Sequence, residues 1–387
     1  MPPTIRTGAL GTQGTNGINQ DQRPIDMMDD VFQYDPPGSP LLNIITRRSQ
    51  VKPAKSTEVK HLEDDIVTEW DVTTQSRVAG DGTVTVANPA IYQNGDIIRV
   101  PSTGETLRVT NVNVGTSTLT ITRSWGATAA ASIGNGAALL NMGAAEMEGD
   151  VAPPAKATVT VTKSNYTQIF KETVHITRTA ENEDVYGGNE RARQQKKAGA
   201  RHAQDIEQTL LHGEKNIDTS TGTYPIRSAG GLDEHITTNV LLVNGALLES
   251  EFHAFIGEVF RHTVRPGRTK KLLFCSRAML GTIAGWGLAK IQTNSGLGQK
   301  YGLSITEYLS PYGTLEIINH PLLEQGFAGS AYIVDPDGVW LRPYRRTKLE
   351  TGIQTPGEDA FKDQYITETS FSFAKERAFG KLVGVTA

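Results

Sequence analysis

Side chains that could do chemistry are spread along the sequence without forming a recognised catalytic constellation. The single thiol, Cys275, lies inside the apolar run KKLLFCS, where we expect a small core residue rather than a nucleophile. No two histidines are four residues apart and no HExxH occurs, so no helical zinc motif is present in the sequence. We expect surface or packed polar roles for all eight histidines: His61, His175, His202, His212, His235, His253, His262 and His320.

Motifs for phosphate binding and acyl transfer are also missing from the sequence. It contains neither GxxxxGK[ST] nor GxSxG, and GLGQKYG at Gly296–Gly302 has the wrong spacing for a dinucleotide fingerprint. The acidic pair Asp64-Asp65 lies in a polar extended segment, where a raised carboxyl pKa would be hard to sustain. We therefore predict no enzymatic activity, no cofactor and no metal ion; an enzyme with a poorly marked site is the alternative.

Length, composition and charge limit the class of protein to which the chain can belong. The chain has 387 residues, of which 37% are apolar and 21% charged, enough for two or three globular domains. The net charge of −4 indicates that any contact with nucleic acid is local or loose. One cysteine excludes an intrachain disulfide, and the N-terminus lacks a signal-peptide pattern. The longest apolar run, Ala278–Ala289, is too short to span a bilayer, so we expect no membrane contact and folding in a reducing cytoplasm.

Two extended segments predict the arms of a long hairpin. The first, STEVKHLEDDIVTEWDVTT at Ser56–Thr74, is strongly polar, and the second, at Ala155–Thr177, alternates Val and Ile with Thr and Lys. Such a ribbon cannot bury one side on its own protein, so it must be solvated or must lie on another molecule.

Between the two arms lies a segment of different character. Gly80–Met142 predicts five short strands separated by turn signals, typical of a small barrel or sandwich. It carries three acidic and three basic residues, and its aromatic residues are Tyr92 and Trp125. We interpret it as an inserted interaction or spacer module; a fold that is merely tolerated at a loop tip is the alternative.

A long helix is predicted after the second arm, from Asn189 to about Leu211. Its narrow stripe of small and apolar residues indicates close packing on a sheet or another helix. The stripe comprises Ala192, Gly199, Ala203, Ile206 and Leu210. The first half of the helix is basic, which favours either a solvated face or a contact with a neighbouring subunit or DNA.

The rest of the chain predicts a compact α/β subdomain and closing strands. A helix at Leu248–His262, the strand KKLLFCS and a following helix indicate strand–helix alternation over about residues 240–330. GSAYIVDPDGVWLRPYRR then predicts a hairpin turning at Asp335–Gly338, followed by one or two long strands.

This order of elements resembles the major capsid proteins of tailed bacteriophages, whose fold is shared with encapsulins. The resemblance is carried by VHITRTAENEDVYGGNERARQQKKAGARHAQDIEQTLLHG and by the C-terminal segment beginning GVWLRPYRR, in which Glu368 precedes an ERAFGKL-like ending. It resembles the subgroup that carries an extra β module in the extended loop. Some members join a lysine to an asparagine; Lys163 and Lys171 lie on the ribbon, but no matching acid and asparagine are identified, so that activity is not carried over.

The resemblance implies an α+β capsid fold with a defined order of parts. These are an N-terminal arm (residues 1–54), a first loop arm (55–79), a β-rich module (80–149), a return arm (150–183), a peripheral domain with a spine helix (184–239), an axial domain (240–330) and closing strands (331–387). The absence of a long charged helix before residue 55 predicts no large fused scaffolding domain.

The expected function is a structural one. The resemblance implies hexamers and pentamers in an icosahedral shell, assembled in the host cytoplasm around loosely contacted double-stranded DNA, with portal, scaffold and decoration proteins as partners. An encapsulin-like compartment, and a tail or adhesion protein with a carbohydrate-binding module, are the alternatives. Candidate inter-subunit contacts are Glu63, Asp64, Asp65, Lys163, Lys171, Arg191, Arg193, Lys196, Lys197 and Arg201.

Overall fold

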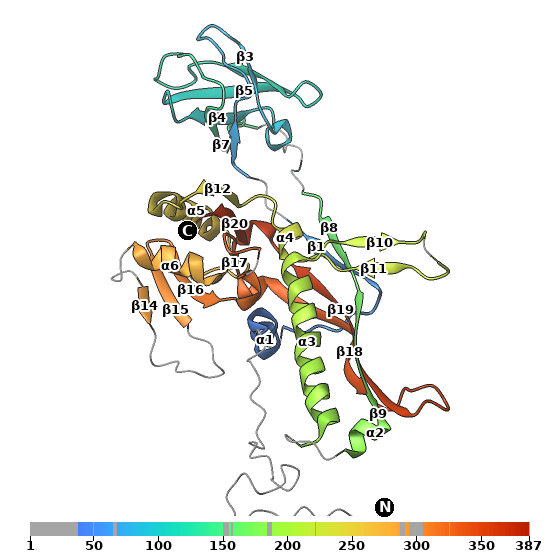
Figure 1. The fold of residues 1–387 in the computed structure, drawn as a ribbon. Helices are drawn as coiled ribbons and strands as arrows, with labels where there is room; N and C mark the ends of the chain where they lie inside the picture. The colour runs from blue at the N-terminus through green and yellow to red at the C-terminus, as the bar shows by residue number, and fades with distance from the viewer. Residues whose placement is uncertain are drawn as a thin grey trace, which may run out of the picture. The chain divides into compact units, whose positions relative to one another are not determined.

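The protein divides into two compact units in a computed structural model (Figure 1). The module comprises Leu62–Lys163, and the main unit comprises residues 1–61 and 164–387. The structure describes residues 38–48, 50–64, 68–149, 155, 158–183, 188–220, 222–286, 291–293, 305–324 and 326–386. Most of the expected N-terminal arm, residues 1–37, lies outside the described residues.

A seven-stranded mixed sheet forms the axial part of the main unit, in the order β12-β20-β17-β13-β16-β15-β14. Its strands are β12 (Val240–Gly245), β13 (Lys270–Cys275), β14 (Ile291–Thr293), β15 (Ile305–Ser310), β16 (Gly313–Asn319), β17 (Ala331–Val334) and β20 (Gly380–Val385). Helices α5 (Glu249–Arg261) and α6 (Arg277–Gly285) bury Phe252, Ile256 and Met279 in one cluster with Leu273 and Cys275. Cys275 is fully buried, as expected, and burial raises the pKa of its thiol to about 12.

The expected hairpin at Asp335–Gly338 is wrong. β17 pairs with β13 and β20, whereas the next strand, β18 (Val339–Glu350), joins a different sheet. The cause is the burial of every residue of β17, since a continuous apolar run suits the interior of a sheet rather than one arm of a surface hairpin. Strands from residues 331–387 therefore complete the axial sheet, which extends beyond the expected 240–330 boundary.

A three-stranded antiparallel sheet, in the order β18-β19-β9, lies against the long helix α3 (Glu190–His212). β9 spans Gln168–Thr177 and β19 spans Ala360–Phe373. Asn189 begins the helix by accepting a hydrogen bond from the Ala192 amide at 2.8 Å. A Cβ at Gly199 would lie 3.3 Å from the Tyr365 ring, so this glycine permits the close approach of helix and sheet.

The buried stripe of α3 differs from the expected one. Ile206 and Leu210 are buried as predicted, but Ala192 is exposed, and two polar residues, His202 and Glu207, lie in the stripe. Hydrophobic periodicity could not find them, because their burial depends on partners from distant elements.

The expected hairpin of two long arms is only partly correct. β1 (Glu58–Glu63) pairs with β8 (Val161–Tyr166) in a two-stranded sheet; these strands and the adjoining residues to Asp64 and from Thr158 are hereafter the ribbon. The second half of the return arm, β9, pairs instead with β19 over ten residues and is covered by α3. β9 carries enough alternating apolar side chains, including Phe170 and Val174, to be buried within its own chain.

Smaller elements complete the main unit. They are α1 (Pro40–Arg47), α2 (Arg178–Asn182), α4 (Leu232–His235), the hairpin of β10 (Asn216–Asp218) and β11 (Ile226–Ser228), and 3-10 turns at Pro321–Leu323, Pro336–Gly338 and Glu376–Ala378. A second core cluster unites α1 and α3 with the axial sheet, through Leu41, Leu210, Phe274 and Tyr332 among others.

The module is a six-stranded antiparallel sheet in the order β2-β7-β4-β5-β6-β3. Its strands are β2 (Trp70–Val72), β3 (Thr83–Thr85), β4 (Asp96–Val100), β5 (Glu105–Asn113), β6 (Thr118–Thr122) and β7 (Ala138–Ala144), with a 3-10 turn at Pro89–Ile91. A bridge between Thr73 and Val86 joins the ends of its two edge strands, so the sheet closes towards a barrel with its own core. The module therefore begins earlier than residue 80, and the first loop arm is shorter than residues 55–79.

Candidate inter-subunit surfaces

The basic face of α3 is partly neutralised within its own chain. Arg191 forms a two-pronged ion pair with Asp363 of β19, with Nε–Oδ2 and Nη2–Oδ1 distances of 2.7 and 2.8 Å. The hydrogen bonds from Arg191 lower the pKa of the buried Asp363 carboxyl below its usual value. Arg193 pairs with Glu190, and Arg201 with Glu172 of β9 at 3.0 Å. Each of these three arginines therefore has a carboxylate partner within its own chain.

The four lysines of the predicted set lie differently. The side chains of Lys196 and Lys197 are exposed one turn further along α3 than the arginines at its start. Lys163 of β8 and Lys171 of β9 are exposed as well. The subunit thus presents these four ammonium groups at its surface, where they are candidates for contact with another molecule.

The ribbon exposes apolar side chains on an otherwise polar strand pair. Leu62, Val159 and Val161 are 67%, 86% and 56% exposed. Asp64 accepts a hydrogen bond from the Thr158 hydroxyl at 3.0 Å, which ties the two arms together. Glu63 also has a partner, and Asp65 lies outside the described residues. Asp64 of the predicted set is therefore hydrogen-bonded within the ribbon, while the apolar residues of the ribbon are exposed at the surface.

Glu368, the glutamate singled out in the C-terminal segment, is buried in the middle of β19. Its Oε1 accepts a hydrogen bond from the Thr167 hydroxyl at 2.9 Å, and its Oε2 accepts one from Arg345 Nε at 2.8 Å. This carboxylate joins the start of β9 to β18 and β19, so its observed contacts hold the peripheral sheet together.

A second buried carboxylate, Glu207 of α3, was missed by sequence reasoning. Its oxygens accept hydrogen bonds from the Leu41 and Leu42 amides of α1 at 2.7 and 2.8 Å. His320 Nε2 donates to Glu207 Oε1 at 2.8 Å, because His320 Nδ1 already accepts from the Leu322 amide. Glu207 therefore joins α1, the long helix and the axial sheet at one buried point.

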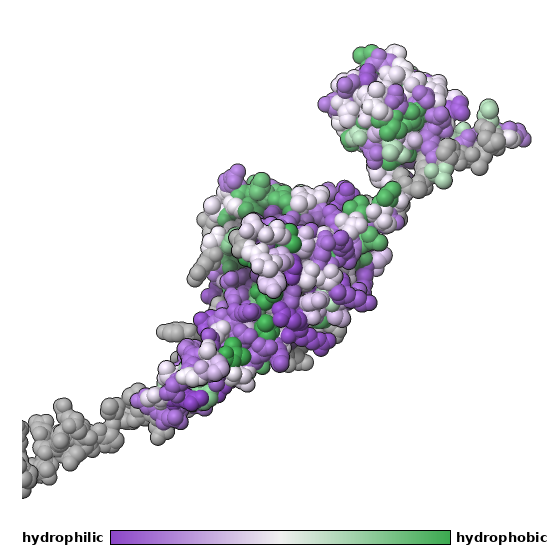
Figure 2. Space-filling view, turned by 90° about the vertical axis from the view of Figure 1, so that its right-hand side faces the viewer, coloured by the Kyte–Doolittle hydropathy of each residue, from purple (hydrophilic) through white to green (hydrophobic). Residues whose placement is uncertain are grey.

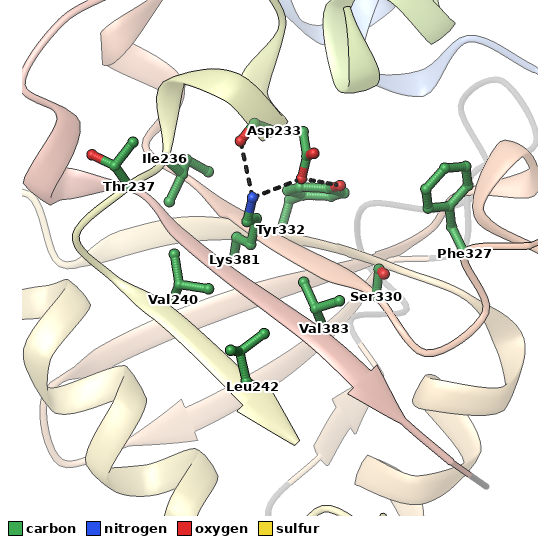
Figure 3. Close-up of a pocket in the computed structure, with 10 residues that line it drawn as sticks. All are labelled: Asp233, Ile236, Thr237, Val240, Leu242, Phe327, Ser330, Tyr332, Lys381 and Val383. Carbon is green, nitrogen blue, oxygen red and sulfur yellow. Dashed lines mark hydrogen bonds and ion pairs between the residues drawn. The ribbon is translucent and has the colours of Figure 1, made fainter. Parts of the chain in front are cut away.

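An open pocket of about 470 Å³ lies beside the edge strand β12 (Figure 3). Its apolar lining includes Leu242 and Phe327, which are 71% and 43% exposed. At its polar end, Lys381 Nζ lies 3.0 Å from Asp233 Oδ1, and the Tyr332 hydroxyl donates to the same oxygen at 3.1 Å. The polar groups satisfy one another, so the pocket offers apolar contact rather than a reactive group.

Other apolar residues reach the surface on the β10–β11 hairpin, where Tyr224 and Ile226 are 83% and 62% exposed. Figure 2 shows hydrophobic residues at the surface as separate patches among hydrophilic ones. Clustered exposed apolar residues are candidates for contact with other molecules. Among the described residues, no cluster of metal-ligating side chains and no helix able to cross a membrane occurs.

Comparison with known proteins assigns this arrangement to a class. The family model described as SU10 major capsid protein matches residues 7–386, so the chain belongs to the SU10 major capsid protein family. A major capsid protein of Pseudomonas phage PaMx41 is 27% identical over 299 residues, which cover 73% of this chain and 71% of the relative.

Solved structures show the same fold at low sequence identity. A protein of Mycobacterium phage Bobi has a TM-score of 0.51 at 9% identity and covers 97% of this chain and 100% of that one. The capsid of a native GTA particle also has a TM-score of 0.51, at 6% identity, covering 98% of this chain and 100% of that one. The α+β fold is thus the tailed-phage major capsid fold, and the protein is a structural component of the phage head.

Proposed function

We propose that this capsid protein assembles as hexamers and pentamers into an icosahedral head shell, with the ribbon of each subunit lying on a neighbouring subunit. The observation that carries this proposal is the exposure of Leu62, Val159 and Val161 on a strand pair that the described chain leaves uncovered. Burial of such side chains at repeated contacts stabilises a shell by roughly 25 cal/mol per Å² of apolar surface.

The proposal also assigns contacts to the exposed lysines. Lys163, Lys171, Lys196 and Lys197 would contact neighbouring copies. Arg191, Arg193 and Arg201 have ion-pair partners within the subunit and are weaker candidates for such contacts. The net charge of −4 suits a shell that encloses double-stranded DNA and contacts it only loosely. Portal, scaffold and decoration proteins would be its partners, with assembly in the host cytoplasm.

Electron microscopy of the purified full chain tests the assembly. We expect rings or closed uniform shells from the wild type, and fewer of both from the double variant Leu62→Ser/Val159→Ser, because each substitution removes an apolar side chain from the contact. The thermal unfolding midpoint of dissociated subunits should stay the same, since both side chains are exposed.

Val114→Ser is the matched control, because Val114 is 62% exposed but lies on the turn between β5 and β6. It should leave assembly unchanged. A protein that stays monomeric at high concentration, or a double variant that assembles as well as the wild type, would contradict the proposed role of the ribbon.

A further inference from the structure

One outward face of the module gathers large apolar side chains in register. Trp70 of β2 lies opposite Leu140 of β7, which in turn lies opposite Arg99 of β4, and Arg99 lies opposite Thr106 of β5. Alternation places Val72 on the same face as Trp70, and Met142 on the same face as Leu140. Hereafter this is the tryptophan face.

Trp125 reaches the same face from the loop after β6. Its amide donates to the Thr106 carbonyl at 2.9 Å, and the Arg108 guanidinium lies 4.9 Å from the centre of its ring. Trp70 and Trp125 are 53% and 47% exposed. Three strand spacings separate β2 from β5, so the two tryptophans flank a surface on the order of 14 Å wide.

Charge is divided between the two sides of these strands. On β4 and β5 the acidic residues Asp96 and Glu105 point inward and are buried, whereas Arg99 and Arg108 point outward. Within the described part of the module, neither arginine forms an ion pair with a carboxylate, and Arg108 Nε is buried without a hydrogen-bond partner. The tryptophan face is therefore both apolar and positive.

This composition favours a protein partner over a carbohydrate. Interfaces between proteins are enriched in Trp, Met and Arg and depleted of Lys, Asp and Glu, with apolar residues at the centre. Leu140 of β7 lies between Trp70 and Arg99, so apolar surface continues inward from the edge strand β2. The charged groups described on the face are guanidinium donors, whereas a glycan requires acceptors as well.

We propose that the tryptophan face binds the segment Pro24–Asp35 of a neighbouring copy. This segment, PIDMMDDVFQYD, contains four aspartates, no lysine or arginine, and the apolar residues Ile25, Met27, Met28, Val31, Phe32 and Tyr34. Its charge and apolar content complement the face, and it is present in the same number of copies as the module. This inference rests on the proposed shell in one respect: the shell brings the segment of one copy close to the module of a neighbouring copy.

The test is fluorescence anisotropy with a labelled synthetic peptide of residues 24–35. The receptor is the full chain with Asp26, Asp29, Asp30 and Asp35 each changed to Asn, so that its own segment does not compete. We expect saturable binding that weakens with added salt and falls at least tenfold in Trp125→Ala and in Arg99→Glu. Val78→Ala, at a side chain 64% exposed outside the face, should bind as the parent does.

Absence of saturable binding, or binding that Trp125→Ala and Arg99→Glu leave unchanged, overturns the proposal. Binding of alginate but not of the peptide would assign the face to an acidic polysaccharide and would overturn it as well. A second readout is disulfide formation between Met28→Cys and Val72→Cys in assembled particles, with the buried Cys275 retained. Particles that form normally without peptide binding would reject this inference while leaving the proposed shell intact.

Discussion

Lys271 shows how a single charged side chain is retained inside the axial core. Its Nζ donates to the carbonyls of Val259, His262 and Ala378, each at 2.7 Å. The first two carbonyls lie at the C-terminal end of α5, where a cation interacts favourably with the helix dipole. Burial nevertheless lowers the pKa of Lys271 to about 8, because the ammonium group has lost its water.

This burial predicts an unusual pH dependence. Between pH 8 and the ordinary lysine value of 10.5, the unfolded chain binds a proton that the folded chain has released, so the unfolding free energy rises with pH. The rise due to Lys271 is at most roughly 3 kcal/mol. Chemical denaturation of the wild type and of Lys271→Met at pH 7.5 and 10 measures it, because the other titrating groups are common to both proteins.

The stability difference between wild type and Lys271→Met should shift in favour of the wild type at the higher pH. A difference that is the same at both pH values would show that Lys271 carries no pH-dependent contribution.

At the scale of the element, α1 depends on a partner from another helix. The Ser39 side chain makes no capping hydrogen bond, and the Leu41 and Leu42 amides donate instead to Glu207 of α3. A buried carboxylate at a helix N-terminus is favoured by both the free amides and the dipole. One side chain distant in sequence therefore helps to hold α1 on the main unit, beside the apolar contacts of Leu41 and Ile45.

The substitution Glu207→Gln should loosen α1 selectively. The new side-chain amide places a donor where one of the backbone amides of α1 donates, so the unfolding free energy should fall by about 1–3 kcal/mol. Hydrogen exchange at Leu41 and Leu42 should accelerate more than exchange in β13. Asp205→Asn, at an exposed residue of the same helix, is the control and should change neither quantity. Unchanged protection of the Leu41 amide in the Glu207→Gln variant would contradict this role of the carboxylate.

Sequence predicts local features of the elements better than their pairing. The start of α3 at Asn189, the bounds of α5 and strands β3 to β7 of the module follow from caps, periodicity and turn residues within a few positions, and the structure confirms them. The pairing of β9 with β19, and of β17 with β13, joins residues far apart in sequence. Local patterns contain no information about such partners, which explains why both were assigned to the wrong hairpins.

At the scale of the whole molecule, the module has a core of its own. Its buried cluster, which includes Val100, Leu107 and Leu119, draws all its members from within residues 62–163. The sequence predicted an inserted β module but placed its start too late, because the polar residues around Trp70 suggested a continuation of the ribbon. The contribution of Trp70 to the tryptophan face was missed for the same reason.

Deletion of the module tests its independence. We expect a chain in which residues 62–163 are replaced by a short Gly-Ser linker to keep the fold of the main unit, because both large core clusters of that unit lie outside the deleted residues. Circular dichroism should show cooperative unfolding of the shortened chain, and electron microscopy should show weaker assembly than in the wild type. Loss of cooperative unfolding would contradict the view of a separable insert.

The position of β20 has a consequence for synthesis. This strand lies between β12 and β17, although the residues that it pairs with in β12 precede it by about 140 positions along the chain. During translation the axial sheet therefore lacks an inner strand until residues 380–385 emerge from the ribosome. A nascent chain has no complete axial sheet before that point, so we expect polymerisation to begin only after these residues have emerged.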